Sequence, residues 1–193
     1  MTAKALFSML DLSAPDAAKR LLGCELERIL PDGHVLRVRI VETEAYDEND
    51  PGSHTYRGKT LRNSIMFGPA GFLYVYFIYG MHHCCNVVTG PDGHGEAVLI
   101  RAVEPITGES EIIGRRHGAT GKNVTNGPSK LCEALGITRE LNGHDLSRQP
   151  VRLHIKPALA DTEIIQTTRI GLRLGADTPW RFYVKDNPYV SKR

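Results

Sequence analysis

The sequence predicts a single α+β domain over residues 1–193, built on a curved, mostly antiparallel β-sheet of barrel-like form with helices at its margins. The first observation is size: 193 residues with 41% hydrophobic side chains fit one domain with a sizeable core. The second is a series of alternating β-branched and aromatic stretches separated by short turns rich in Gly, Pro and Asp. The third is that the helical stretches are short and sit between strands, without repeats or linkers.

The N-terminal part predicts a short helix and then a β-hairpin. Ser13 is a suitable N-cap, Asp16 follows three residues later, and Gly23 ends the apolar periodicity, so a helix is expected at residues 13–22. Two alternating stretches then flank a Pro-Asp-Gly turn, which is a hairpin signal. The strands are expected at residues 24–30 and 34–46, with the turn at residues 31–33.

A polar stretch at residues 47–59 predicts a long loop between this hairpin and a second group of strands. Loops of this length inside a compact domain are often functional. The second group reads as an antiparallel meander, because three apolar stretches are separated by two turns. The strands are expected at residues 72–79, 84–89 and 97–103, with turns at residues 80–81 and 90–93.

The C-terminal half is less regular but still mixes helices and strands. Residues 106–126 predict a helix and then a loop, and residues 139–145 are ambiguous. A clearer helix is expected at residues 128–135, because Pro128 suits a first-turn position and Gly136 provides a stop. Three further strands are expected, at residues 151–155, 168–172 and 180–185.

Charge and cysteine content narrow the classes of protein that fit. The net charge is +2, which permits a nucleic-acid partner without requiring one. The charge is uneven: residues 151–193 hold eight Lys or Arg against four acids, while residues 42–50 hold five acids and no base. Four cysteines without a CxxC spacing, no targeting segment and no apolar run of membrane-spanning length predict a cytoplasmic protein, nucleoid-associated or, in a eukaryote, nuclear.

The end of the strand expected at residues 34–46 is the first candidate catalytic element. Alternation places Glu42, Glu44 and Tyr46 on one face, together with the apolar Val38 and Ile40. A carboxylate beside buried apolar surface is costly unless it is hydrogen-bonded or used in chemistry. The alternation therefore indicates that this strand end forms the edge of a catalytic site, but it leaves the choice between the two carboxylates open.

The aromatic hairpin at residues 73–82 is the second candidate element. Tyr74 and Tyr76 share one face with Ile78, whereas Val75 and Phe77 fall on the other face and suit the core. Tyr79 stands at the tip, beside Gly80, where packing in a core does not explain an aromatic ring. An exposed ring on a narrow hairpin is suited to stacking on a base or entering a minor groove.

The run of residues 82–85 raises the alternative of a zinc hydrolase. His82, His83, Cys84 and Cys85 are residue types that bind zinc. Adjacent residues of a strand point to opposite faces, so these four side chains are not expected to converge on one ion. We therefore expect no metal there and interpret the two cysteines as small buried thiols.

Taken together, several motifs in this order resemble the alkyladenine (3-methyladenine) DNA glycosylase family. The similarity extends over nearly the whole chain from about Leu10, and its specificity comes from the combination of motifs. The residues that carry it are Glu44-Ala45-Tyr46, His54, Met66-Phe67, Gly71 to Tyr76, Ile78 to Met81, Asn86, Leu99 to Pro105, Asn126 to Leu131 and Arg181 to Val184.

The resemblance implies a role for each matching residue. It assigns Glu44 as the general base that activates a water against the sugar C1′, and Arg101 as a group near that water and the nucleotide's phosphate. It implies that Asn86 rejects guanine by a clash with its exocyclic amine, and that Tyr79 fills the gap left in the duplex. The resemblance also places a base pocket at Tyr46, His54, Tyr76, Asn86 and Leu99, and backbone contacts at Lys130 and His82.

The implied activity is that of a monofunctional DNA glycosylase acting on double-stranded DNA that contains damaged purines. The expected substrates are 3-methyladenine, 7-methylguanine and ethenoadenine, while hypoxanthine would need its leaving group protonated or hydrogen-bonded. No cofactor is expected, and the protein is expected to be a monomer with a protruding, DNA-intercalating β-hairpin. A DNA-damage binding module without catalysis is the alternative, because it would keep Tyr79 but would not need Glu44.

Overall fold

Strand β2, Val35–Tyr46, forms the axis of the fold. The computed structural model describes residues 8–192. One edge of β2 pairs antiparallel with β5, Ala97–Thr107, along most of its length. The other edge pairs first with β1, Glu25–Ile29, and then, after Ile40, with β9, Arg181–Val184. The C-terminal end of β2 therefore lies between β5 and β9.

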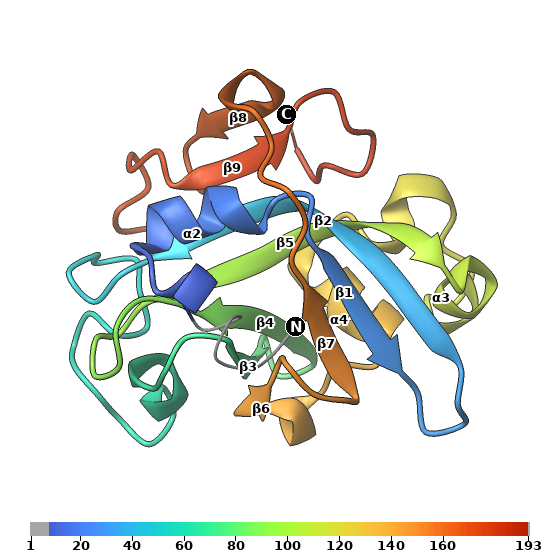
Figure 1. The fold of residues 1–193 in the computed structure, drawn as a ribbon, viewed down its shortest axis with the longest axis horizontal. Coiled ribbons are helices and arrows are strands. Elements are labelled where there is room, and N and C mark those ends of the chain that lie inside the picture. The colour runs from blue at the N-terminus through green and yellow to red at the C-terminus, as the bar shows by residue number, and fades with distance from the viewer. Residues whose placement is uncertain (1–7, 193) are drawn as a thin grey trace.

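The strands form one curved antiparallel sheet, which is visible in Figure 1. Its order is β6-β3-β4-β5-β2-β1-β7, with β8 joined to β9 beside the end of β2. The first and last strands of this order, β6 and β7, also approach each other. The amide of Leu153, on β7, donates to the carbonyl of Leu146, the residue after β6, at 2.8 Å. The remaining strands are β3 (Phe72–Ile78), β4 (His82–Val88), β6 (His144–Asp145), β7 (Val151–His154) and β8 (Ile164–Thr167).

The predicted α+β class with a curved, mostly antiparallel sheet is therefore confirmed. Both predicted hairpins form, β1 with β2 and β3 with β4, and β5 completes the meander. Helices α2 (Ala14–Leu21), α3 (Glu109–Arg115) and α4 (Pro128–Leu135) lie at the margins of the sheet, and residues 8–10 are also helical. Four 3₁₀ turns complete the described elements, at Ser64–Phe67, Gly121–Val124, Arg139–Leu141 and Asp161–Glu163.

Helix α2 begins and ends where the capping residues predicted. The Ser13 hydroxyl accepts a hydrogen bond from the Asp16 amide, which satisfies one of the free N–H groups of the first turn. The helix buries Ala17, Ala18 and Leu21 against the sheet. The Ala18 carbonyl then accepts the Thr43 hydroxyl at 3.0 Å, so α2 is tied to the functional end of β2.

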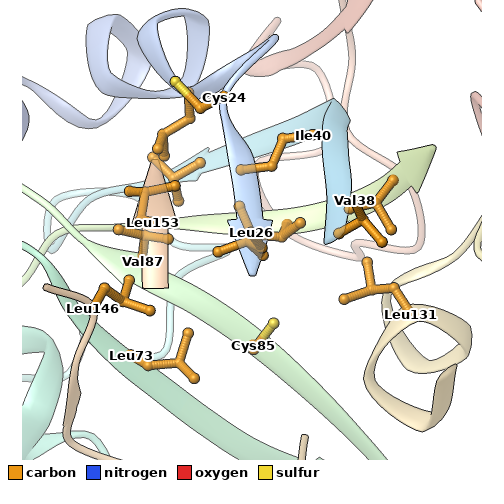
Figure 2. Close-up of a cluster of buried hydrophobic side chains, with 14 of the residues drawn as sticks. Cys24, Leu26, Val38, Ile40, Leu73, Cys85, Val87, Leu131, Leu146 and Leu153 are labelled. Atoms are coloured by element: carbon orange, nitrogen blue, oxygen red, sulfur yellow. The ribbon is translucent and has the colours of Figure 1, made fainter. Parts of the chain in front are cut away.

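The main core fills the space between the curved sheet and helices α2 and α4. Figure 2 shows that Leu26, Val38 and Ile40 point into this core from β1 and β2. Side chains from β3, β4 and α4 meet them, and each fully buried aliphatic side chain contributes about 1.5–3 kcal/mol. The labelled members of this cluster are Cys24, Leu26, Val38, Ile40, Leu73, Cys85, Val87, Leu131, Leu146 and Leu153.

The strand predicted at residues 168–172 is wrong. The strand in this region is β8, which ends at Thr167 and pairs with β9. Beyond it the chain leaves the sheet, because Arg169 is buried in an ion pair with Asp50 and the Ile170 amide donates to Glu44. These contacts replace a strand ladder with bonds to the site, which a pattern of apolar residues does not reveal.

Helix length bears on the expectation that the protein does not span a membrane. Within residues 8–192, every helix is too short or too polar to cross a lipid bilayer. The longest α-helices there have eight residues, compared with about 20 for a membrane-spanning helix.

Candidate active site

The site lies where β2 stops pairing with β1 and begins to pair with β9. The pairing of β2 with β5 shifts register on both sides of Glu42, so the strand is irregular at this point. Glu42 and Glu44 are both fully buried, and both approach the guanidinium of Arg101 on β5. The Arg101 Nε lies 3.3 Å from Glu42 Oε1, and its Nη1 lies 3.4 Å from Glu44 Oε1. The predicted shared face therefore exists, with one cation between the two carboxylates.

Glu42 is saturated by structural partners. Its Oε1 accepts from Arg181 Nη1 at 2.8 Å and from the Ser191 hydroxyl at 2.9 Å. Its Oε2 accepts from the Ser191 amide at 2.7 Å. These bonds fasten β9 and the C-terminal segment to β2, and they leave little of this carboxylate for a substrate.

Glu44 has fewer partners, and those belong to the pocket. Its Oε2 accepts from the Tyr46 hydroxyl at 2.8 Å, and its Oε1 accepts from the Ile170 amide at 2.9 Å. Burial, followed by the neighbouring Glu44 carboxylate, holds the pKa of Tyr46 well above its usual value of 10.0, so this phenol remains a donor. Glu44 is thus held in one orientation beside Tyr46 and Arg101.

A small pocket opens next to Glu44. Its volume is about 80 Å³, well below the roughly 300–1,000 Å³ of pockets that take drug-sized ligands. A flat group held between aromatic rings suits so narrow a space. The pocket is lined by Tyr46, Gly52, His54, Met66, Tyr76, Asn86 and Leu172.

Three aromatic side chains make up one wall of this pocket region. Tyr74 and Tyr76 are stacked, with ring centroids 5.3 Å apart, and His54 meets Tyr76 edge-on at 4.7 Å. The His54 Nδ1 lies 3.2 Å from the Tyr74 hydroxyl. Burial lowers the pKa of His54 below its usual 6.5, so the imidazole is neutral at physiological pH. The wall therefore offers π surfaces and neutral hydrogen-bonding groups.

The structure brings some of the predicted residues together and leaves others apart. Tyr46, His54, Tyr76 and Asn86 all line the pocket. Leu99 lies opposite both Glu44 and Asn86 in the sheet and links them, but it is not among the lining side chains.

The hairpin tip lies outside the pocket. Tyr79 has a positive φ of 51° and is 87% exposed, and it stands between β3 and β4. His82 begins β4 as the partner of Ile78. Lys130 is on α4, where its Nζ donates to Asn126 Oδ1 at 2.7 Å. None of these three side chains is among the residues that line the pocket.

The side chains of residues 82–85 point to both faces of β4. Cys84 is opposite Tyr76 on the pocket side, while Cys85 belongs to the main core. Burial raises the pKa of the Cys84 thiol to about 12, so the thiol stays protonated. His83 packs instead against the ring of Phe77, with centroids 4.9 Å apart.

Several site groups were not predicted from the sequence. The Ile170 amide carries no side-chain signal, so only the folded backbone reveals it as a partner of Glu44. Leu172 and Gly52 line the pocket from two segments that were expected to be a strand and a loop. Arg169 follows Gln166, Thr167 and Thr168, so the local sequence gives no sign of its buried ion pair with Asp50.

A separate cluster of titratable groups lies just beyond Tyr46. The His94 Nε2 is 2.9 Å from Asp47 Oδ2 and 3.3 Å from Glu96 Oε1, and its Nδ1 is 3.1 Å from Glu48 Oε1. Hydrogen bonding to Asp47 is the main cause that raises the pKa of His94. Three of these groups, Asp47, His94 and Glu96, are close enough to share a cation. The contacts fasten the loop after β2 to the turn before β5.

Comparison with known proteins identifies the family. A model described as methylpurine-DNA glycosylase matches residues 8–188, which is nearly the whole chain. The chain belongs to the methylpurine-DNA glycosylase family. It is therefore a DNA glycosylase, a hydrolase of N-glycosyl bonds, and the predicted resemblance is confirmed.

Similar proteins from three organisms support this membership. A protein of Carboxydothermus hydrogenoformans is 52% identical over 177 residues, which cover 91% of this chain and 92% of that protein. One of Methanoculleus marisnigri is 50% identical over 91% of this chain and 92% of its own length. A protein of Francisella tularensis is 44% identical over 189 residues, which cover 96% of this chain and 97% of that protein. Each bears the name "Putative 3-methyladenine DNA glycosylase".

Proposed function

We propose that this glycosylase is monofunctional and removes alkylated purines from double-stranded DNA by means of a water that Glu44 activates. The substrates would be 3-methyladenine, 7-methylguanine and ethenoadenine, with hypoxanthine as a deaminated substrate. The observation that carries the proposal is the Glu44 carboxylate, which is buried, oriented by Tyr46 and Ile170, and adjacent to a narrow aromatic pocket.

Glu44 is suited to act as a general base. Hydrolysis at C1′ passes through an oxocarbenium-like transition state, so one carboxylate and one water suffice. The negative charge of Glu44 would also stabilise the positive charge that develops on the sugar. Arg101, whose side chain is 12% exposed, lies beside the carboxylate and could contact the water or the phosphate.

The pocket is suited to an alkylated purine. A purine carrying an extra methyl group at a ring nitrogen is cationic, and electron-rich rings such as Tyr46 and Tyr76 favour cations. Such a base is also a good leaving group and needs no strong acid. The buried Oδ1 of Asn86 has no hydrogen-bond partner within the described residues, so it is free to accept a hydrogen bond from the edge of a bound base.

Entry into so small a pocket requires the nucleotide to leave the duplex. A stacked base cannot expose its glycosidic bond, and extrusion costs a few kcal/mol of unstacking. Tyr79 would offset part of this cost by filling the gap. Its exposed ring and its left-handed backbone, which few side chains other than glycine adopt, support a functional role. His82 and Lys130 would then contact the DNA backbone.

The reaction would end at the abasic site. Strand β2 contains arginines but no lysine, so a Schiff base with the sugar is not expected from the catalytic strand. No metal or redox cofactor enters this scheme, and a monomer is sufficient because every proposed group comes from one chain.

Duplex oligonucleotides that each carry one lesion test the proposal. Purified protein is incubated with duplexes containing hypoxanthine or ethenoadenine, and abasic sites are detected by alkaline cleavage, with and without EDTA. Release of the damaged base with no strand cleavage before alkali is expected. Binding to the lesion without abasic sites would instead favour the non-catalytic damage-binding module.

A further inference from the structure

Arg169 is a buried cation that joins two separate walls of the pocket. Its side chain is fully buried, and its Nη1 donates to the Ala45 carbonyl at 2.9 Å. Both terminal nitrogens bond the Asp50 carboxylate, with Nη2 at 2.8 Å from Oδ1, and Nη2 also donates to the Gly175 carbonyl at 2.9 Å. Its guanidinium lies 4.8 Å from the centroid of the Tyr46 ring.

Each segment that Arg169 connects supplies part of the candidate active site. Asp50 belongs to the loop after β2, which also provides Gly52 and His54 to the pocket. On the other side, the residue after Arg169 donates its amide to Glu44, and Leu172 lines the pocket. The ion pair therefore joins the loop that supplies Gly52 and His54 to the segment that supplies Ile170 and Leu172. We call the boundary between these two segments the seam.

The seam is tightly packed at Gly52. A Cβ atom placed on Gly52 would lie 3.0 Å from Leu172 Cδ1, 3.0 Å from the Leu174 carbonyl oxygen and 3.2 Å from Arg169 Nη2. These separations are tighter than nine in ten real Cβ contacts, so with a side chain there the neighbouring atoms would have to move by a few tenths of an ångström. Glycine thus permits the close approach that the Arg169 contacts hold.

We propose that Arg169, together with Asp50, is a positioning residue for catalysis, which sets the spacing between Glu44 and the pocket wall; this inference rests on the proposed function. The guanidinium suits this role because its planar fork makes several bonds at once in fixed directions. A lysine would keep the charge opposite Asp50, but one ammonium on a flexible stem cannot reproduce all four bonds. Misplacement of a catalytic group by about 1 Å can cost on the order of 100-fold in rate.

Three variants test this role. Arg169→Lys removes most of the four guanidinium hydrogen bonds and preserves the positive charge. Gly52→Ala places a methyl group between the two segments and removes no charge. Arg28→Lys is the matched control, because Arg28 is also buried and bonds two backbone carbonyls, of Leu135 and Ile29, but lies on β1 outside the pocket. Thermal unfolding defines a temperature at which each variant is folded.

Two rate and binding measurements are then made at that temperature. The first is single-turnover base release from an ethenoadenine duplex at saturating protein, and the second is the Kd for a duplex with a tetrahydrofuran abasic analogue, which has no base to hold. We expect Arg169→Lys and Gly52→Ala to lower the release rate at least about tenfold and to change the Kd by less than about threefold. Arg28→Lys should change neither.

Two results would overturn the proposal while leaving the proposed function intact. One is wild-type base release by folded Arg169→Lys, and the other is an equal loss of rate and affinity, which indicates general loosening. If Arg169→Lys does not fold, Gly52→Ala decides between the same outcomes. Failure of the wild-type protein to release any base would contradict the proposed function itself.

Discussion

Replacing Glu42 by Gln separates the two buried carboxylates of β2 experimentally. The substitution keeps the shape of the side chain but removes its charge and turns one acceptor into a donor. Glu42 accepts three hydrogen bonds, one from Arg181 and two from Ser191, and forms an ion pair with Arg101. Gln therefore brings an NH₂ group against at least one of these donors and leaves buried guanidinium charge without its partner.

The expected cost follows from the burial of the pair. Glu42 is fully buried and the Arg181 side chain is 5% exposed, so solvent cannot replace the lost partner. Breaking such a pair costs about 3–5 kcal/mol of unfolding free energy. In a protein of this size, each kcal/mol lowers Tm by roughly 2–4 °C, so the predicted fall is roughly 6–20 °C.

Urea unfolding and single-turnover base release measure the two consequences of Glu42→Gln. The free energy of unfolding should fall by the amount above, and base release per folded molecule should stay within about tenfold of wild type, because Arg101 is the one Glu42 partner among the described residues that also contacts Glu44, and Arg101 keeps its ion pair with Glu44. The reasoning is refuted if Glu42→Gln unfolds like wild type, or if a folded variant loses base release as completely as Glu44→Gln.

Three further predictions use other parts of the chain. Tyr79→Ser should weaken binding and slow release from duplex DNA by roughly 5- to 150-fold, the value of about 1–3 kcal/mol of stacking, and should leave Tm unchanged because Tyr79 is exposed. An unchanged release rate removes the wedge role. His94→Gln should destabilise the protein more at low pH than at high pH, because the hydrogen bond to Asp47 raises the pKa of His94 in the folded state. The stabilisation that protonated His94 gives the folded state is complete below its unfolded pKa of about 6.5, and it is lost as pH rises through the folded pKa. Equal urea midpoints for wild type and variant at acidic pH contradict this. EDTA should leave base release unaltered, whereas a loss restored by added metal would point to a cation at Asp47, His94 and Glu96.

Much of the fold could be predicted because local signals and tertiary structure agree. Ser13 and Gly23 mark the ends of α2, and the Pro-Asp-Gly turn marks the first hairpin. The strand expected at residues 168–172 failed because its apolar pattern is shared by a segment that bonds across to Asp50 and Glu44 instead of pairing. Such bonds join residues more than 100 positions apart, so no local pattern contains them.

The candidate site was predicted in part for a similar reason. Tyr46, His54, Tyr76 and Asn86 carry recognisable side chains, and they do meet in one pocket. Alternation placed Glu42 and Glu44 on one face but could not rank them, because the difference lies in their partners. Those partners come from the C-terminal segment for Glu42 and from a backbone amide for Glu44.

The most direct test of the account is base release by Glu44→Gln on a hypoxanthine duplex, measured in a single turnover with saturating protein. The variant should still bind the lesion, because the aromatic pocket and Tyr79 are unchanged, while base release falls by about 10²–10⁴-fold, the usual contribution of a general base. Normal base release by folded Glu44→Gln would contradict the account, because another group would then have to activate the water.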